Sequence, residues 1–312
     1  MPVPTPTQVP RVDGAISVVM GWRYTIALAR DGSVWAWGAN EYGELGRGRK
    51  INGGEGLPVP ERVRGLTDVQ AIAAGGGHSL ALRRDGSVWA WGANGYGEAG
   101  GRGGSRAIPA RIPALPFIVA IAAGENHSLV LSHDGTVWAW GRHVEDDTAE
   151  EAIPTPRQVP GVTGAVAVAG GQFHSLALKG DGTIWAWGAG YFGQLGNGRE
   201  ESESVPVRVH DLDDVTAIAA AGLHSIAVRE DGTVWIWGAP ELGDPEVGNE
   251  AAPTRMLGLR NVVAVATAEN HAIALLNDGT VRTWGWNNWG QLGNGRFEPK
   301  VDSAVEIVLP LL

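Results

Sequence analysis

Residues 69–100 read VQAIAAGGGHSLALRRDGSVWAWGANGYGEAG, and this stretch decides the fold because the chain repeats it. Residues 165–196 read AVAVAGGQFHSLALKGDGTIWAWGAGYFGQLG, which matches it nearly position for position. Self-similarity at a period of roughly 50 residues is typical of a repeat protein. An Asp-Gly pair marks each of the copies, and the pairs start at Asp31, Asp85, Asp134, Asp181, Asp231 and Asp278.

Each copy divides into short strands separated by turns. In the second copy, Val69–Ala74 is apolar, His78–Leu82 follows a glycine turn, and Ser87–Trp91 alternates in polarity. The Asp-Gly pair before Ser87 predicts a hairpin turn, because these residues tolerate a positive φ. A glycine-rich loop then leads to a strand that contains proline, such as Val59–Val63 in the first copy. Proline suits an outer strand because it cannot donate to a ladder, so each copy predicts a four-stranded propeller blade.

The copies together predict an all-β fold, a closed β-propeller of six four-stranded blades, with seven blades as the alternative. We expect residues 1–312 to form this single domain, with almost no helix because no segment keeps a 3.6-residue period. The repeats are placed at about 12–63, 64–112, 113–159, 160–209, 210–256 and 257–309.

The two ends of the chain both carry a candidate outer strand. Ala304–Leu309 completes the last copy, whereas Thr5–Pro10 matches Thr155–Pro160. The sequence thus offers one outer strand more than six blades need. We expect both termini to lie in the last blade, because an open ring would leave an unpaired edge.

The composition excludes several classes of function. The chain has no cysteine, so disulfides, thiol nucleophiles and cysteine metal sites are impossible. A formal net charge of −10 makes nucleic acid an unfavourable partner. No apolar run is long enough for a membrane helix, and we expect a monomer. The sequence fits the cytoplasm as it stands, or secretion if a leader peptide has been removed, and does not decide between them.

Histidine and tryptophan recur in columns that could be mistaken for catalytic or metal-binding groups. The histidine column is His78, His127, His174, His224 and His271, and most of its members precede a serine. Neighbouring residues on a strand point to opposite faces, so an adjacent His and Ser cannot form a catalytic dyad. We interpret the histidines as hydrogen-bonded to a neighbouring turn, and the Trp-x-Trp pairs as packing between blades. The sequence predicts no catalytic residue, no metal site and no cofactor.

Positions at which the copies differ are better candidates for binding than positions that they share. The two-residue turns before the histidine column should lie at one mouth of the central channel. Their candidate binding residues are Trp22, Arg23, Glu125, Asn126, Gln172, Phe173, Leu223, Glu269 and Asn270. Trp and Arg are enriched at binding hot spots, although ordinary surface turns would explain these residues equally well.

The loops after the Trp-x-Trp strands form the second candidate set. Their candidate binding residues are Tyr42, Tyr96, Tyr191, Trp286, Trp289, Glu145, Asp146 and Asp147. The later loops are strongly acidic, whereas the first two are near neutral. Such polarity can steer a partner of complementary charge, or it can serve solubility alone.

The pattern IAAG-xx-HSLAL-xx-DG-x-VWAWG-xN-xx-GQLG resembles the repeat of the regulator of chromosome condensation family over roughly residues 12–309. The resemblance implies a propeller, often of seven blades. Proteins that share it include a guanine-nucleotide exchange factor, a plant ultraviolet-B photoreceptor and a secreted β-lactamase inhibitor. Because one fold hosts many functions, the resemblance does not choose among them.

A non-catalytic propeller that binds a protein partner through its channel-mouth turns and loops is the function that the sequence favours. One alternative is an enzyme or small-ligand binder that uses the mouth, with Glu125 or Glu269 as general acid or base. A secreted inhibitor of the propeller type and nucleotide exchange on a small GTPase are the others.

Overall fold

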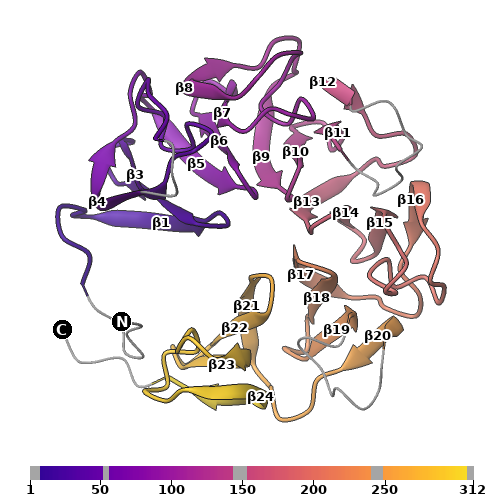
Figure 1. Ribbon diagram of the computed structural model, residues 1–312. Helices are drawn as coiled ribbons and strands as arrows, with labels where there is room; N and C mark the ends of the chain where they lie inside the picture. Colours follow the sequence, from indigo (N-terminus) through magenta and orange to yellow (C-terminus); the bar gives the residue numbers. More distant parts are fainter. Residues whose placement is uncertain (1–7, 52–55, 143–152, 240–248, 308–312) are drawn as a thin grey trace. The chain divides into compact units, whose positions relative to one another are not determined.

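All the regular structure in the described part of the chain is β-strand. The computed structural model describes residues 8–51, 56–142, 153–239 and 249–307, and no helix occurs in these ranges. The strands, labelled in Figure 1, form six antiparallel four-stranded sheets, each of which joins four strands consecutive in the sequence. The chain is therefore a β-propeller of six blades, and the all-β prediction is confirmed.

Each of the first three blades runs from an inner to an outer strand in sequence order. Blade 1 contains β1 (Ala15–Met20), β2 (Tyr24–Ala29), β3 (Val34–Ala39) and β4 (Gly56–Arg62). Blade 2 contains β5 (Val69–Ala74), β6 (His78–Arg83), β7 (Val88–Gly92) and β8 (Arg106–Arg111). Blade 3 contains β9 (Ile118–Ala123), β10 (His127–Ser132), β11 (Val137–Gly141) and β12 (Ile153–Gln158).

The last three blades repeat this order. Blade 4 contains β13 (Ala165–Gly170), β14 (His174–Lys179), β15 (Ile184–Gly188) and β16 (Glu203–Arg208). Blade 5 contains β17 (Val215–Ala221), β18 (His224–Arg229), β19 (Val234–Gly238) and β20 (Glu250–Arg255). Blade 6 contains β21 (Val262–Thr267), β22 (His271–Leu276), β23 (Val281–Asn287) and β24 (Glu298–Glu306).

The chain forms two compact units. One, called the N-terminal unit, runs from Val9 to Phe173. The other, called the C-terminal unit, contains Gln8 and the described residues from His174 onward. The boundary falls between the first two strands of blade 4.

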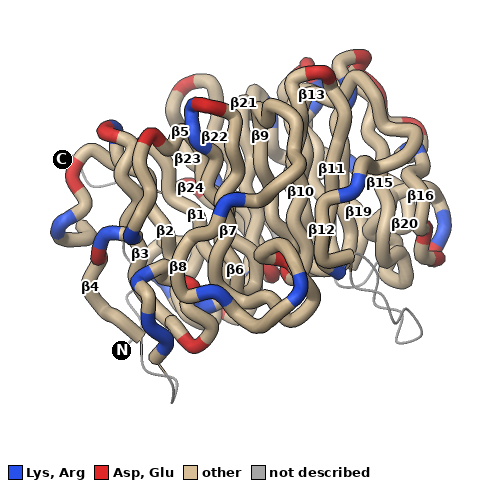
Figure 2. Tube along the Cα trace, turned by 90° about the horizontal axis from the view of Figure 1, so that it is seen from above, with Lys and Arg blue, Asp and Glu red and all other residues tan. Residues whose placement is uncertain are grey.

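The Asp-Gly pairs form the predicted turns between the second and third strands of each blade. In blade 2, Asp85 Oδ1 accepts hydrogen bonds from the Ser87 backbone N–H at 3.0 Å and from the Ser87 hydroxyl at 2.6 Å. These bonds stabilise the ionised carboxylate and lower the pKa of Asp85. Figure 2 shows that many charged residues of the chain lie in turns and loops. The Asp-Gly turns define one end of each blade, which we call the Asp-Gly end.

In blades 2 to 5, the two members of each Trp-x-Trp pair have different surroundings. The second member is buried there, as Trp91, Trp140, Trp187 and Trp237, whereas Trp37 of blade 1 is half-buried. The first member is only half-buried, and its indole N–H bonds the side chain two residues earlier, as in Trp89 to Ser87 at 3.3 Å. The prediction that both tryptophans pack between blades therefore holds for the second tryptophan of blades 2 to 5, whereas the first lies at the hairpin turn.

The outer strand of blade 6 is supplied by the C-terminal end of the chain. Strand β24 pairs with β23, with Arg282 opposite Glu306. Ala304 thus lies in the predicted outer strand. The N-terminal copy, Thr5–Pro10, lies mostly outside the described residues, so the expected meeting of the termini stays a prediction.

Candidate functional site

The two predicted sets of binding residues meet at the same end of each blade. The turn between the first and second strands and the loop between the third and fourth strands both lie opposite the Asp-Gly end, because neighbouring strands are antiparallel. Backbone hydrogen bonds of 2.8 Å join turn to loop, from Ala39 to Arg23 and from Arg142 to Asn126. We call this end of the blades the loop end.

Successive turns of the N-terminal unit are also joined to one another. The backbone N–H of Trp22 donates to the Gly76 carbonyl at 3.2 Å, and that of Gly76 donates to the Glu125 carbonyl at 3.1 Å. The Glu125 N–H continues the series to the Gly171 carbonyl at 3.2 Å. The predicted turns of blades 1 to 4 therefore form a continuous, hydrogen-bonded rim.

One position in the loop between the third and fourth strands is hydrogen-bonded both to its own loop and to a buried core tryptophan. Glu44 of blade 1 occupies it, and the carboxylate accepts a hydrogen bond of 2.8 Å from the Tyr42 backbone N–H. The Glu44 carbonyl oxygen accepts a hydrogen bond from the buried Trp91 indole of blade 2. We call the residues at this position the corner residues, and they are Glu44, Glu98, Gln194 and Gln291.

Two corner residues are buried carboxylates where other blades have glutamine. Glu44 and Glu98 are 4% and 2% exposed, and burial raises the pKa of both carboxyls. Gln194 accepts the equivalent bond from the Phe192 backbone N–H at 2.9 Å. The negative charge is thus not needed for this turn geometry.

Aromatic side chains project from the loop end of the N-terminal unit. Tyr42 and Tyr96 precede their corner residues by two positions and are 50% and 39% exposed. Trp22, on the first turn, is 67% exposed, and Arg23 beside it is exposed. Aromatic residues and arginine are the residue types that contribute most affinity in protein interfaces. The loop end of the N-terminal unit exposes both types.

Phe173 lies differently from the prediction. Its ring is buried, and the guanidinium of Arg142 lies 5.7 Å from its centroid and 5.1 Å from that of Tyr96. Arg142 therefore bridges aromatic rings from blades 2 and 4, at distances typical of cation–π contacts. The buried Phe173 ring thus packs beneath the Arg142 guanidinium. Arg142 was not among the predicted binding residues.

The remaining turn residues of the N-terminal unit are half-buried. They are Glu125, Asn126 and Gln172. The predicted acidic residues Glu145, Asp146 and Asp147 lie outside the described residues.

The C-terminal unit carries its own exposed aromatics at the loop end. Trp289 is 72% exposed, and Trp286 is 41% exposed. Tyr191 is exposed, but the residue equivalent to Tyr42 and Tyr96 is its neighbour Phe192, which also donates to a corner residue. The other predicted turn residues lie at this end, with Glu269 exposed and Leu223 and Asn270 half-buried.

Three histidines of the column, His78, His174 and His224, contact hydroxyl groups of the following blade. His78 Nε2 lies 2.9 Å from the Ser128 hydroxyl, and both side chains are fully buried. The Ser128 hydroxyl donates its own proton to the Glu98 carbonyl at 2.8 Å. His78 Nε2 must therefore carry the proton and donate it to Ser128, which leaves Nδ1 as an unprotonated atom against Gly75.

These His–Ser pairs cannot act as catalytic dyads. A general base needs an unprotonated nitrogen facing the hydroxyl, whereas His78 faces Ser128 with an N–H. Burial also lowers the pKa of His78 to about 4, so the ring is neutral. His174 lies 2.9 Å from the Ser225 hydroxyl, which donates to the Gln194 carbonyl in the same way. The prediction that these histidines are hydrogen-bonded is confirmed for His78 and His174, but the predicted partner was wrong, because it is a strand serine of the next blade and not a neighbouring turn.

Within the described residues, no group of three or more His, Asp or Glu side chains is placed to hold a metal ion. No helix in these ranges is long and apolar enough to cross a membrane. The notable features of the site are therefore a rigid scaffold and an exposed aromatic rim.

The sequence profile of the RCC1-like domain matches residues 2–310. The chain belongs to this family. The resemblance of its repeats to the regulator of chromosome condensation is thereby confirmed. This RCC1-like chain shares the family's propeller fold, and the family as a whole does not fix which partner it binds.

Named relatives match only part of this RCC1-like chain. The mitochondrial RCC1 domain-containing protein RUG3 of Arabidopsis thaliana is 48% identical over 84 residues, which are 27% of this chain and 18% of RUG3. The probable E3 ubiquitin-protein ligase HERC3 of Homo sapiens is 39% identical over 87 residues, covering 27% of this chain and 8% of HERC3. The matched segments thus span less than a fifth of either relative.

Solved structures match the RCC1-like chain over most of its length. Human WBSCR16 has a TM-score of 0.86 at 24% identity, covering 98% of this chain and 85% of that one. Yeast RCC1 (Prp20), in a structure with Kap60, has a TM-score of 0.81 at 26% identity, covering 94% of this chain and 75% of that one. Prp20p from Saccharomyces cerevisiae, described with its binding to Gsp1p and histones, has a TM-score of 0.79 at 25% identity, covering 94% and 77%.

Proposed function

We propose that this chain is a non-catalytic propeller that binds a protein partner through the loop end of its N-terminal unit. The observation that carries the proposal is the hydrogen-bonded rim, which presents Trp22 and Arg23 at the same end of the blades as the exposed Tyr42 and Tyr96. Yeast RCC1 (Prp20) is described bound to Kap60 and with binding to Gsp1p and histones, which supports a binding role for a related propeller.

Rigidity is the second support for the proposal. The Tyr42 and Tyr96 backbones are fixed by Glu44 and Glu98, whose carbonyls are in turn held by buried tryptophans. A loop backbone already fixed before binding loses less conformational entropy when a partner covers it. The rim therefore suits a partner that docks without rearranging the propeller.

Affinity capture from the lysate and the medium of the source organism tests the proposal. Wild type is compared with a Trp22→Ala/Arg23→Ala variant, which removes two exposed rim side chains. Arg208→Gln, at the Asp-Gly end, is the matched control. Proteins captured by wild type and by the control, and lost from the rim variant, support the proposal. Identical capture by all three proteins contradicts it.

A further inference from the structure

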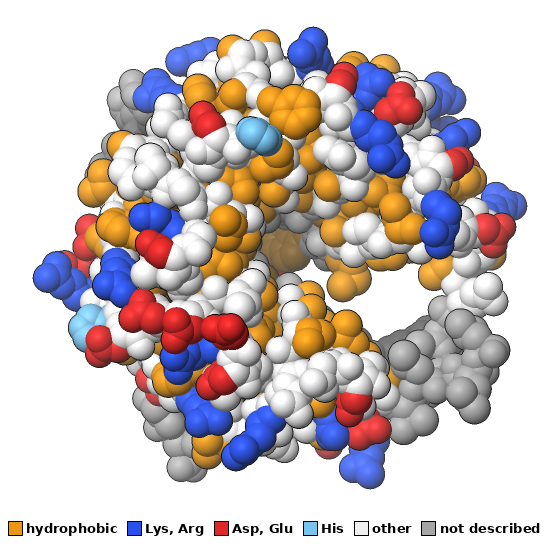
Figure 3. All heavy atoms as spheres, turned by 180° about the vertical axis from the view of Figure 1, so that it is seen from behind, with side chains coloured by type: hydrophobic (Ala, Val, Ile, Leu, Met, Phe, Trp, Pro, Cys, Tyr) orange, Lys and Arg blue, Asp and Glu red, His pale blue; other side chains and the backbone are white. Residues whose placement is uncertain are grey.

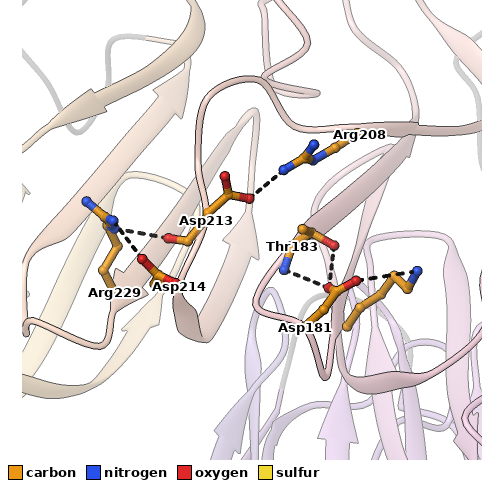
Figure 4. Close-up of polar contacts among 7 residues, drawn as sticks. Asp181, Thr183, Arg208, Asp213, Asp214 and Arg229 are labelled. Carbon is orange, nitrogen blue, oxygen red and sulfur yellow. Dashed lines mark hydrogen bonds and ion pairs between the residues drawn. The ribbon is translucent and has the colours of Figure 1, made fainter.

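The turn that connects one blade to the next at the Asp-Gly end is a charged element in blades 4 and 5. Between β16 and β17, Arg208 pairs with the Asp213 carboxylate, as Figure 4 shows. Arg229, at the end of β18, pairs with the Asp214 carboxylate at 3.1 Å and donates to the Asp213 carbonyl at 3.0 Å. This turn therefore satisfies its arginines with its own carboxylates.

The connection between blades 1 and 2 repeats the contacts of Arg229 but not those of Arg208. Arg83, at the end of β6, donates to the Thr67 carbonyl at 2.8 Å and lies 3.4 Å from the Asp68 carboxylate. Arg62, at the end of β4, lies 3.6 Å from the Asp31 carboxylate. Both arginines again have an acidic partner within the chain.

The connection between β8 and β9 departs from this pattern. It reads Ile112-Pro113-Ala114-Leu115-Pro116-Phe117-Ile118, so Pro116 and Phe117 stand where the later turn has Asp213 and Asp214. Phe117 is 54% exposed, and its ring lies edge-on to His133 at a centroid distance of 6.5 Å. Figure 3 shows a face of the molecule on which hydrophobic side chains are exposed beside a histidine, in the upper part of the view.

This exchange of acids for apolar residues leaves a pocket at the surface of the N-terminal unit. The pocket has a volume of about 500 Å³, and its apolar lining includes Pro113, Leu115, Pro116 and Phe117. Volumes of about 300–1,000 Å³ are typical of ligand sites. Its size suits one large side chain of a partner together with the neighbouring backbone.

Arg111 lines the pocket together with Asp85, and its positive charge is one of the causes that lower the pKa of the Asp85 carboxyl. The place of Arg111 in the blade is that of Arg208, since Trp89 pairs with Arg111 and Trp185 with Arg208. Among the described residues, the Arg111 side chain makes no ion pair or hydrogen bond, and Pro116 stands where Arg208 has its acidic partner Asp213. Asp85 also lines the pocket, but its Oδ1 already accepts the two hydrogen bonds from Ser87.

We propose that this pocket binds a peptide segment of a partner protein in which a large apolar side chain lies close to a carboxylate. The apolar side chain packs against Phe117 and its neighbours, and the carboxylate pairs with Arg111. The partner thereby supplies the charge that Asp213 supplies within the chain at the later connection. A bidentate arginine–carboxylate pair at the rim of an apolar pocket gives both affinity and orientation.

The pocket is independent of the protein-binding rim proposed above. It lies at the Asp-Gly end of blades 2 and 3, whereas the rim lies at the loop end of the same strands. A substitution in one is therefore expected to leave the other intact, and failure of either proposal leaves the other standing.

Fluorescence polarisation with short labelled peptides tests the proposal. The peptides carry Phe, Trp, Leu or Ala at a central position and Glu, Gln or Lys two residues away. The proteins are wild type, Arg111→Gln, Phe117→Ser and the matched control Arg208→Gln, each checked by its thermal melt. We expect wild type and the control to prefer an aromatic or Leu with Glu. Arg111→Gln should lose the preference for Glu over Gln, at least about tenfold in affinity. Phe117→Ser should weaken every apolar peptide.

Three results would overturn the proposal. The first is that no peptide binds wild type. The second is that Arg111→Gln and Arg208→Gln bind the Glu peptides equally. The third is that phenylacetate, a free carboxylate, binds wild type as tightly as the best peptide, which would assign the pocket to a small acid instead.

Discussion

The indole Nε1 of Trp91 donates a hydrogen bond of 2.6 Å to the carbonyl oxygen of Glu44, a loop residue of the preceding blade. The same tryptophan fills the core between blades 1 and 2. Packing between blades and positioning of the exposed loop thus depend on one side chain. The equivalent bonds from Trp140 to Glu98 and from Trp237 to Gln194 are 2.9 Å long.

Trp91→Ala is expected to lower the free energy of unfolding by about 3–5 kcal/mol, as other large core truncations do. Trp89→Ala serves as the matched control, because Trp89 is half-buried at the hairpin turn and should cost clearly less. Chemical denaturation of both variants measures the difference. Equal losses for the two variants would show that burial of the second tryptophan is not what stabilises the blade interface.

Glu44→Gln is expected to raise the melting temperature at neutral pH. Burial makes ionisation of Glu44 unfavourable, and Gln194 makes the same turn without a charge. The gain should shrink as the pH falls and the wild-type carboxyl protonates. Thermal melts of both proteins at neutral and acidic pH provide the measurement. A Glu44→Gln variant less stable than wild type at neutral pH would mean that the carboxylate has a partner that favours its charge.

Stability should fall as the pH falls below about 6.5. The pKa values of His78, His174 and His224 are lowered by burial to about 4, 3 and 3, from 6.5 for an exposed histidine. Between these values the unfolded chain binds protons that the folded chain does not, so acid favours unfolding. Each histidine contributes up to about 1.4 kcal/mol per pH unit over this range.

The raised pKa values of Glu44 and Glu98 act in the opposite direction, because these buried carboxyls protonate more readily in the folded chain. They offset part of the histidine effect near the lower end of the range. Melting temperatures measured from pH about 8 down to about 5 check the balance. A melting temperature that stays constant or rises on acidification would contradict the neutral, buried histidine column.

His78→Ala and Ser128→Ala should be coupled, because each removes one side of a buried hydrogen bond between blades. Leaving a buried polar group unsatisfied costs about 1–3 kcal/mol, so each single variant is destabilised. The double variant should lose less than the sum, by about 0.5–3 kcal/mol. A double-mutant cycle by chemical denaturation measures this coupling. Strict additivity would show that the contact of 2.9 Å contributes nothing of its own.

The sequence predicted the blade pattern well because the determining signals are local. Asp85-Gly86 specifies its own turn, and the alternation of Ser87–Trp91 specifies a strand, with the structure placing β7 at Val88–Gly92. Because the same turn and strand patterns recur in each copy, each pattern is supported several times over. Contacts between blades were less accessible, because His78 and Ser128 lie 50 positions apart and nothing in the repeat pairs them.

The candidate binding residues were predicted by position but not by exposure. Phe173 was grouped with exposed turn residues, yet it is buried beneath Arg142, a residue at the start of the next loop. The pocket at Phe117 was also missed. Its signal was present in the sequence, since the connection with Pro116 and Phe117 departs from the acidic pair Asp213-Asp214 of a later copy.

Binding of a protein partner at the loop end of the N-terminal unit is tested by the dissociation constant of a captured partner. Tyr42→Ala/Tyr96→Ala removes two exposed rings while the corner residues beneath them stay in place. Isothermal titration calorimetry compares this variant with wild type and with Arg208→Gln. We predict affinity weakened at least about tenfold by the tyrosine variant, at unchanged melting temperature, and wild-type affinity for the control. Equal dissociation constants for all three proteins would contradict the claim.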